Sequence, residues 1–135
     1  MPITLTPLSD GKGIIVKGHG HVSDEEYREF ISDKLLKLPE NYAGGTFCFH
    51  DYSEVESVDV EAKTISETGL KAAELFEKHP DIQMAVAAPT DLIFGLARMW
   101  TAWLGTESAN ARLFRDSDTA RQWLREEYYS DRVAV

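Results

Sequence analysis

The chain has little of what marks secreted or membrane proteins. Its 135 residues include one cysteine, Cys48, so no internal disulfide can form, which is typical of a reducing compartment. The start lacks a basic region followed by an apolar run, so we expect no secretory signal. No apolar stretch reaches the roughly 18 residues that cross a bilayer. We therefore expect a cytoplasmic protein without a transmembrane segment.

Basic residues are also scarce. The sequence has 14 Lys and Arg against 23 Asp and Glu, for a net charge of −9. Such a charge repels a phosphate backbone, and no stripe of basic residues with interleaved aromatics is present, so we expect no nucleic-acid binding. No repeat or linker divides the chain, and residues 1–135 are enough for one core. They are predicted to form a single domain.

The apolar pattern predicts alternating strands and helices. Two runs rich in β-branched residues are separated by turn residues, which indicates a hairpin. Ser23 followed by Glu26 forms a capping box that starts the first helix. Strands are expected at 3–8, 13–22, 46–52, 82–88 and 110–114, and helices at 23–38, 59–79, 89–104 and from 116 onward. This order predicts an α/β fold with one mixed, mostly parallel sheet of about five strands, an antiparallel N-terminal strand and about four helices.

The stretch from 46 to 64 combines a buried strand, a carboxylate, an acidic segment and a helix start. We interpret Asp51 as the end of the strand, the residues up to Asp59 as a loop, and Asp59 as the cap of the next helix. Phosphorylation of Ser53 or Ser57 would be favoured by the helix dipole but opposed by the surrounding acids. Capping is therefore the preferred interpretation of this segment.

The residues that commonly carry catalysis or bind metal form no convincing motif. His19 and His21 share one side of a strand, and with His50 and Asp51 they match a zinc site in composition only. Cys48 lies among apolar residues that should raise its pKa, and no nucleophile elbow is present. We expect no metal, no cofactor and no catalytic residues.

Three segments and the order of elements resemble the STAS superfamily (sulfate transporter and anti-sigma factor antagonist domains). The likeness is greatest to its SpoIIAA-like branch, whose fold is also similar to CRAL-TRIO lipid-transfer domains. The segments are FHDYSEVESVD at 49–59, MAVAAPTDLIFGLARMW at 84–100 and RLFRDSDTARQWL at 112–124. The resemblance implies a STAS/SpoIIAA-like domain that acts by recognition.

The same resemblance implies where a phosphorylation switch would lie. In anti-sigma antagonists a strand-end Asp is followed by a short loop and then by an Asp directly before the phosphorylated Ser. Matched onto this chain, the first Asp is Asp51, the second is Asp59, and the Ser position is Val60. Valine has no hydroxyl, so the family's switch cannot operate at this position.

The predicted helix at 91–104 is apolar on more than one side. A wide arc is expected to face the sheet: Leu92, Ile93, Leu96, Ala97, Met99, Trp100, Trp103 and Leu104. The opposite side carries Phe94, Gly95 and Arg98 and is nearly uncharged. Such a surface predicts coverage by a second subunit, a partner or an apolar ligand. The alternative is coverage by the C-terminal segment around Tyr128 and Tyr129.

Three functions follow, in order of preference. The first is a non-catalytic protein-interaction module, a homodimer through the helix at 91–104, that presents Asp51, Ser53, Glu54 and Asp59 to an unidentified protein partner. The second is a binder or carrier of a small apolar or lipid molecule between that helix and the sheet. Its candidate contacts, shared with the interface, are Phe94, Gly95, Arg98, Met99, Trp100 and Trp103. The last is an enzyme that uses the three histidines and Asp51.

Overall fold

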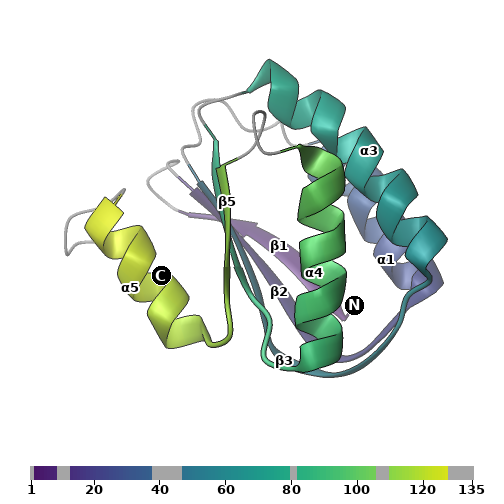
Figure 1. The fold of residues 1–135 in the computed structure, drawn as a ribbon, viewed down its shortest axis with the longest axis horizontal. Helices are drawn as coiled ribbons and strands as arrows, with labels where there is room; N and C mark the ends of the chain where they lie inside the picture. The colour runs from purple at the N-terminus through teal and green to yellow at the C-terminus, as the bar shows by residue number, and fades with distance from the viewer. Residues whose placement is uncertain (1, 9–12, 38–46, 80–81, 106–109, 128–135) are drawn as a thin grey trace.

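Five strands form one mixed sheet in which neighbours along the chain are also neighbours in space (Figure 1). The computed structural model describes residues 2–8, 13–37, 47–79, 82–105 and 110–127. The strands are β1 (Ile3–Pro7), β2 (Gly13–Ser23), β3 (Phe47–Asp59), β4 (Gln83–Ala87) and β5 (Asn110–Phe114). Strand β1 is antiparallel to β2, and every other pair is parallel. The predicted mixed sheet is confirmed.

The helices lie on both faces of this sheet. The described residues form α1 (Asp24–Asp33), a 3₁₀ turn η1 (Leu35–Lys37), α3 (Ala62–Lys78), α4 (Asp91–Leu104) and α5 (Ser117–Glu127). Parallel strands are joined by right-handed connections, so three successive connections in one direction place their helices on one face. Figure 1 shows α1, α3 and α4 on one side of the sheet and α5 on the other. None of the described helices combines the length and the apolarity needed to span a membrane.

Two clusters of buried side chains correspond to these two faces. Successive residues of a strand point to opposite faces, so β3 and β4 contribute to both clusters. The larger cluster, under α1, α3 and α4, includes Val16, Phe30, Leu35, Cys48, Ile65, Phe76, Met84, Val86, Trp100 and Leu104. The smaller cluster, under α5, consists of Phe47, Phe49, Ala85, Ala87, Ala120 and Leu124.

Strand β3 is longer than predicted, and the prediction of a loop from Asp51 to Asp59 was wrong. Its pairing with β4 ends at Asp51, but its pairing with β2 continues to Asp59. The register with β2 shifts twice along this extension, and each shift gives β3 one extra residue. As a result β2 and β3 continue beyond β4 as a two-stranded ribbon, which curves toward the starts of α1 and α3 (Figure 1).

The helix starts on this face follow capping chemistry, with one exception. Ser23 and Glu26 form the predicted capping box, with N···O distances of 3.1 and 3.2 Å. The predicted cap at Asp59 was wrong, because Asp59 is the last residue of β3 and the N-cap of α3 is Glu61, which makes no side-chain cap. The Glu61 amide instead donates to the carboxylate of Asp24 in α1, at 2.9 Å. A residue of one helix thus stabilises the start of another.

Helices α3 and α4 approach each other closely at Gly69. A Cβ atom added there would lie 2.7 Å from Cβ of Trp103 and 3.2 Å from the carbonyl oxygen of Trp100. Real Cβ atoms do not make contacts of 2.7 Å, so a side chain at this position would push α4 away from α3. Glycine at this position therefore sets the place of α4 above the sheet.

Candidate ligand-binding site

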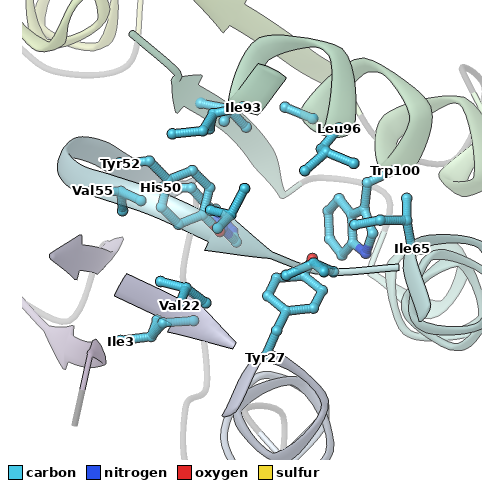
Figure 2. A pocket seen from close by; sticks show the side chains of 14 residues that line it. Ile3, Val22, Tyr27, His50, Tyr52, Val55, Ile65, Ile93, Leu96 and Trp100 are labelled. Carbon is cyan, nitrogen blue, oxygen red and sulfur yellow. The ribbon is translucent and has the colours of Figure 1, made fainter. Parts of the chain in front are cut away.

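A cavity of about 60 Å³ lies between the sheet and α4. It is bounded by β3 and its ribbon, by α4 at the top, by the start of α1 at the bottom and by the start of α3 at the right (Figure 2). Its lining is Ile3, Val22, Tyr27, His50, Tyr52, Val55, Val58, Val60, Ile65, Val86, Ile93, Leu96, Ala97 and Trp100. In doubly wound α/β proteins, ligands bind beyond the carboxyl ends of parallel strands, and this cavity lies at the carboxyl-terminal parts of β2 and β3.

The two register shifts in β3 help to form this lining. On a regular strand Tyr52 and Val55 would point to opposite faces, because their numbers differ by three. Lys17 pairs with Asp51 and His19 pairs with Glu54, so β3 has one extra residue between these pairs. This extra residue reverses the alternation, and the side chains of Tyr52 and Val55 both line the cavity. The second shift restores it for Val58. Gly18 leaves room beside them, since an added Cβ would lie 2.8 Å from a methyl carbon of Val55.

Three alternate residues of β3 form a chain of hydrogen bonds that ends at the cavity. The Sγ atom of Cys48 lies 3.0 Å from Nε2 of His50, and Nδ1 of His50 lies 3.0 Å from the hydroxyl of Tyr52. Cys48 and His50 are both 2% exposed. Both ring nitrogens of His50 therefore have partners, and the chain runs from the core to a phenol in the cavity wall.

Burial keeps each member of this chain uncharged. It lowers the pKa of His50 from 6.5 to about 4, so the imidazole is neutral at pH 7. It raises the pKa of the Cys48 thiol and that of the Tyr52 hydroxyl. The charges of Tyr27 and Cys48 in their ionised forms would add to the rise for Tyr52. The cavity wall thus presents polar but uncharged groups.

Hydrogen bonds of Thr68 stabilise the part of the cavity wall that contains Trp100 and Tyr27. The indole Nε1 of Trp100 donates to Oγ1 of Thr68 at 3.1 Å, and this hydroxyl donates to the carbonyl of Thr64 at 2.7 Å. Burial raises the pKa of Tyr27, and a hydrogen bond with Thr68 partly offsets the rise. These bonds hold Trp100 and Tyr27 in the wall, where Figure 2 shows Trp100 reaching down from α4 and Tyr27 reaching up from α1, both near Ile65.

Asp51 does not belong to this site, although it adjoins His50. It is 2% exposed and points to the α5 face. Its Oδ1 accepts from the amide and hydroxyl of Ser53 at 3.0 and 2.6 Å. Its Oδ2 accepts from the hydroxyl of Ser117 at 3.1 Å and from Nη2 of Arg121 at 3.3 Å. The prediction of an exposed Asp51 was wrong. The side chain is buried, and its hydrogen bonds with Ser117 and Arg121 attach α5 to the sheet.

The other predicted loop residues lie along the ribbon. Ser53, Glu54 and Asp59 are exposed, and Glu54 forms an ion pair of 2.6 Å with Lys17 on β2. Val60, at the position of the family's switch serine, is half-buried and lines the cavity. Asp51 is therefore buried whereas the other three residues of the predicted interaction surface are exposed, although Ser53 donates hydrogen bonds to Asp51.

Of the six predicted contacts on α4, only Trp100 lines the cavity. Gly95 and Arg98 are exposed, and so are Met99 at 37% and Trp103 at 44%, while Phe94 lies against the guanidinium of Arg115 at 4.1 Å. The predicted inward arc was therefore too wide: Leu92 is 60% exposed, and fully buried positions on α4 are Ile93, Trp100 and Leu104. Tyr128 and Tyr129, the alternative cover, lie outside the described residues.

The histidines and Asp51 are not brought together. His50 and Asp51 point to opposite faces of the sheet, and His21 is exposed, with its Nδ1 at 2.7 Å from the hydroxyl of Ser57. Within the described ranges no three His, Cys, Asp or Glu side chains are grouped so that they could hold a metal ion. The composition match to a zinc site therefore has no counterpart in the geometry of these residues.

Sequence reasoning missed most of the cavity. The predicted helix at 23–38 contains Tyr27, the predicted strand at 46–52 contains Tyr52, and the predicted loop contains Val55, but nothing in the sequence placed these three side chains together. The one available signal was the alternation of Cys48, His50 and Tyr52 on β3, which predicts three polar or polarisable groups on one face. The register shifts that add Val55 and Val58 to this face leave no mark in the sequence.

The fold and cavity together define an α/β domain of the SpoIIAA-like type. No model of a known protein family matches the chain, and no curated protein matches it. Among solved structures, it is similar to an uncharacterized protein of the DUF3478 family with a SpoIIAA-like fold from Shewanella loihica PV-4, determined at 2.25 Å. The two chains are 21% identical, with 90% of this chain and 91% of that chain covered and a TM-score of 0.52. At this identity the likeness shows the fold, which is the one predicted.

Proposed function

We propose that this protein is a non-catalytic module that binds a small, largely apolar molecule between α4 and the sheet. The observation that carries the proposal is the cavity itself, whose wall is apolar apart from a few uncharged polar groups. Binding sites for small molecules share this composition, with a mostly hydrophobic wall and few polar groups that orient the ligand. The interaction module favoured by the sequence becomes the second candidate.

The size of the cavity restricts the ligand. One water molecule needs roughly 10–15 Å³ of such space, so about 60 Å³ holds about four to six water-sized groups, and a molecule the size of toluene must extend partly into the opening of the cavity. Val58, Val60, Leu96 and Ala97 are only half-buried, so the cavity reaches the surface between the ribbon and α4. A ligand can enter along this edge without unfolding of the core.

The same geometry supports binding over catalysis. His50 is neutral with both nitrogens in hydrogen bonds, and Cys48 is a buried neutral thiol. A nucleophile needs an activating base or a lowered pKa, and burial shifts the thiol in the opposite direction. The groups that line this site are therefore suited to hold a molecule in place.

Filling the cavity tests the proposal. Amide NMR spectra of the labelled protein would be recorded with toluene and with benzyl alcohol, for wild type, Ala97→Leu and Ala102→Leu. Ala97 lines the cavity, whereas Ala102 is exposed on the same helix and serves as the matched control. We expect both probes to shift cavity amides in wild type and in Ala102→Leu, but not in Ala97→Leu. An absence of shifts in wild type, or full binding by Ala97→Leu, would contradict the proposal.

The second candidate is self-association through the outer face of α4. Leu92, Met99 and Trp103 are 60%, 37% and 44% exposed, and Leu70 of α3, beside Gly69, is 51% exposed. Exposed apolar side chains at neighbouring positions mark contact surfaces. Sedimentation at tens of micromolar tests this candidate: a dimer in wild type that dissociates in Met99→Lys would support it, and a monomeric wild type would remove it.

A further inference from the structure

We propose that the molecule bound in this cavity is an uncharged apolar compound with one hydroxyl or carbonyl oxygen, and that Tyr52 binds this oxygen. The inference rests on the proposed function, because it specifies the ligand of the same cavity. It follows from which polar groups of the wall already have partners and which retain capacity.

The wall excludes charged ligands. None of its fourteen residues is Asp, Glu, Lys or Arg. Moving a carboxylate or an ammonium group from water into such surroundings costs several kcal/mol unless an opposite charge compensates it. A neutral molecule avoids this cost, and its apolar part gains by leaving water.

Most polar atoms of the wall have no capacity left. Nε1 of Trp100 has a single hydrogen, which goes to Thr68. Both nitrogens of His50 are taken, one by Cys48 and one by Tyr52. A phenol can donate one hydrogen bond and accept others, so the two phenols of the wall retain capacity: Tyr52 after its bond to His50 and Tyr27 after its bond with Thr68. We assign the ligand oxygen to Tyr52, which lies at the start of the ribbon between His50 and Val55.

The hydrogen bonds of Cys48 and His50 allow the Tyr52 hydroxyl either to donate a hydrogen bond to the ligand or to accept one from it. A neutral imidazole has one N–H donor and one acceptor nitrogen. If the thiol of Cys48 donates to Nε2 of His50, then Nδ1–H donates to Tyr52, and the phenol hydrogen is free for a carbonyl oxygen of the ligand. If Nε2–H donates to Sγ of Cys48, then Tyr52 donates to Nδ1, and its oxygen can accept from a hydroxyl of the ligand.

Of the three hydrogen-bonded residues on β3, only Tyr52 has a polar group that can reach a ligand in the cavity. Cys48 and His50 are shielded from the solvent, whereas Tyr52 is half-buried and lies beside the ribbon. Figure 2 shows His50 and Tyr52 side by side on β3, with Ile93 and Leu96 of α4 above them. A ligand whose apolar part lies against α4 would place an oxygen at this phenol.

A series of matched probes tests the inference on the full chain. Benzyl alcohol, benzaldehyde, toluene and benzoate share a ring and differ in the polar group, and their affinities would be measured from amide shifts at the cavity. A net hydrogen bond corresponds to roughly a three- to tenfold gain in affinity. We expect the alcohol and the aldehyde to exceed toluene by this factor, and benzoate to bind more weakly than toluene.

Two variants locate the oxygen. Tyr52→Phe should remove the advantage of both oxygenated probes while toluene binds as before. Ser57→Ala is the control, because it removes an exposed hydroxyl from the same strand outside the cavity lining, and it should keep the advantage. Tyr27→Phe tests the other phenol of the wall and should also keep the advantage; its loss there would place the oxygen at Tyr27 and overturn the inference. Equal binding of toluene and benzyl alcohol by wild type, or an advantage that survives in Tyr52→Phe, would overturn the inference and leave the proposed function standing. Failure of every neutral probe would overturn both.

Discussion

His50 and Asp51 are neighbours on β3 with the same exposure, 2%, but they lie in opposite kinds of surroundings. Asp51 faces α5 and accepts hydrogen bonds from Ser53, Ser117 and Arg121. His50 faces α4, where its partners are a thiol and a phenol and where a cavity adjoins it. The carboxylate of Asp51 accepts hydrogen bonds from two elements, whereas the hydrogen-bond partners of His50 lie on its own strand, and its ring lies 6.0 Å from that of Trp100 in α4.

This difference shows how one sheet can serve two purposes. On the α5 face, aromatic and small residues fill the space, and a carboxylate and a guanidinium attach the helix. On the opposite face, α4 is held against α3 at Gly69 and leaves a space above β3. The α5 face thus attaches its helix through a buried carboxylate, whereas the α4 face, which carries the larger buried cluster, contains the candidate site.

The largest effect is expected from Asp51→Ala. The change removes the acceptor for three residues and leaves Arg121, only 32% exposed, without its buried partner. Breaking a buried ion pair costs about 3–5 kcal/mol, and the partial exposure of Arg121 reduces the expected loss of unfolding free energy to about 3 kcal/mol. Urea unfolding measures it. Glu54→Ala, on the same strand but exposed, is the control and should cost less than about 1 kcal/mol. Equal losses of unfolding free energy in the two variants would show that Asp51 does not attach α5 to the sheet.

Lowering the pH should weaken the α4 face through His50. Its pKa is about 4 when folded against 6.5 when unfolded, so between these values the unfolded chain binds more protons. Stability is therefore complete above pH 6.5, falls as the pH drops toward 4, and levels off below, by about 3 kcal/mol in total. Urea unfolding between pH 7.5 and 4 measures the slope. His50→Gln should show a shallower slope over this range, and an unchanged slope would assign the effect to other groups.

Adding volume should distinguish the filled face from the open one. Ala85 is 0% exposed and belongs to the buried cluster under α5, so Ala85→Leu should cost about 1–3 kcal/mol by overpacking. Ala97 borders the cavity, so Ala97→Leu should be neutral or slightly stabilising. Denaturation midpoints of the two variants make the comparison. A greater loss in Ala97→Leu than in Ala85→Leu would show that the cavity cannot accept a larger group.

The smallest effects are expected at two helix starts. Ser23 caps α1, and Asp116 accepts from the amide of Thr119 at 2.8 Å in the first turn of α5. Replacing either by Ala should cost about 1 kcal/mol. Only Ser23→Ala should also weaken probe binding, because α1 carries Tyr27 into the cavity wall. Thermal unfolding and the NMR titration check the two parts; weaker binding in Asp116→Ala would show that the faces are coupled.

The sequence was informative where local chemistry decides. The order of elements, the antiparallel first strand and the cap at Ser23 were all predictable, because periodicity and capping act within a few residues. The acids at 51–59 were misread as a loop, because exposed strand residues and loop residues have similar composition. The width of the inward face of α4 was also misjudged, since it depends on how closely α3 approaches at Gly69.

Pattern and capping alone determined that this chain forms one mixed sheet with helices, without an evident catalytic motif. Only the tertiary structure decided which face of β3 borders a cavity, that β3 shifts register twice against β2, and that α4 leaves a space above Tyr52. The reason is physical: a strand's alternation is local, but register shifts and the separation of packed elements depend on partners far away in the chain.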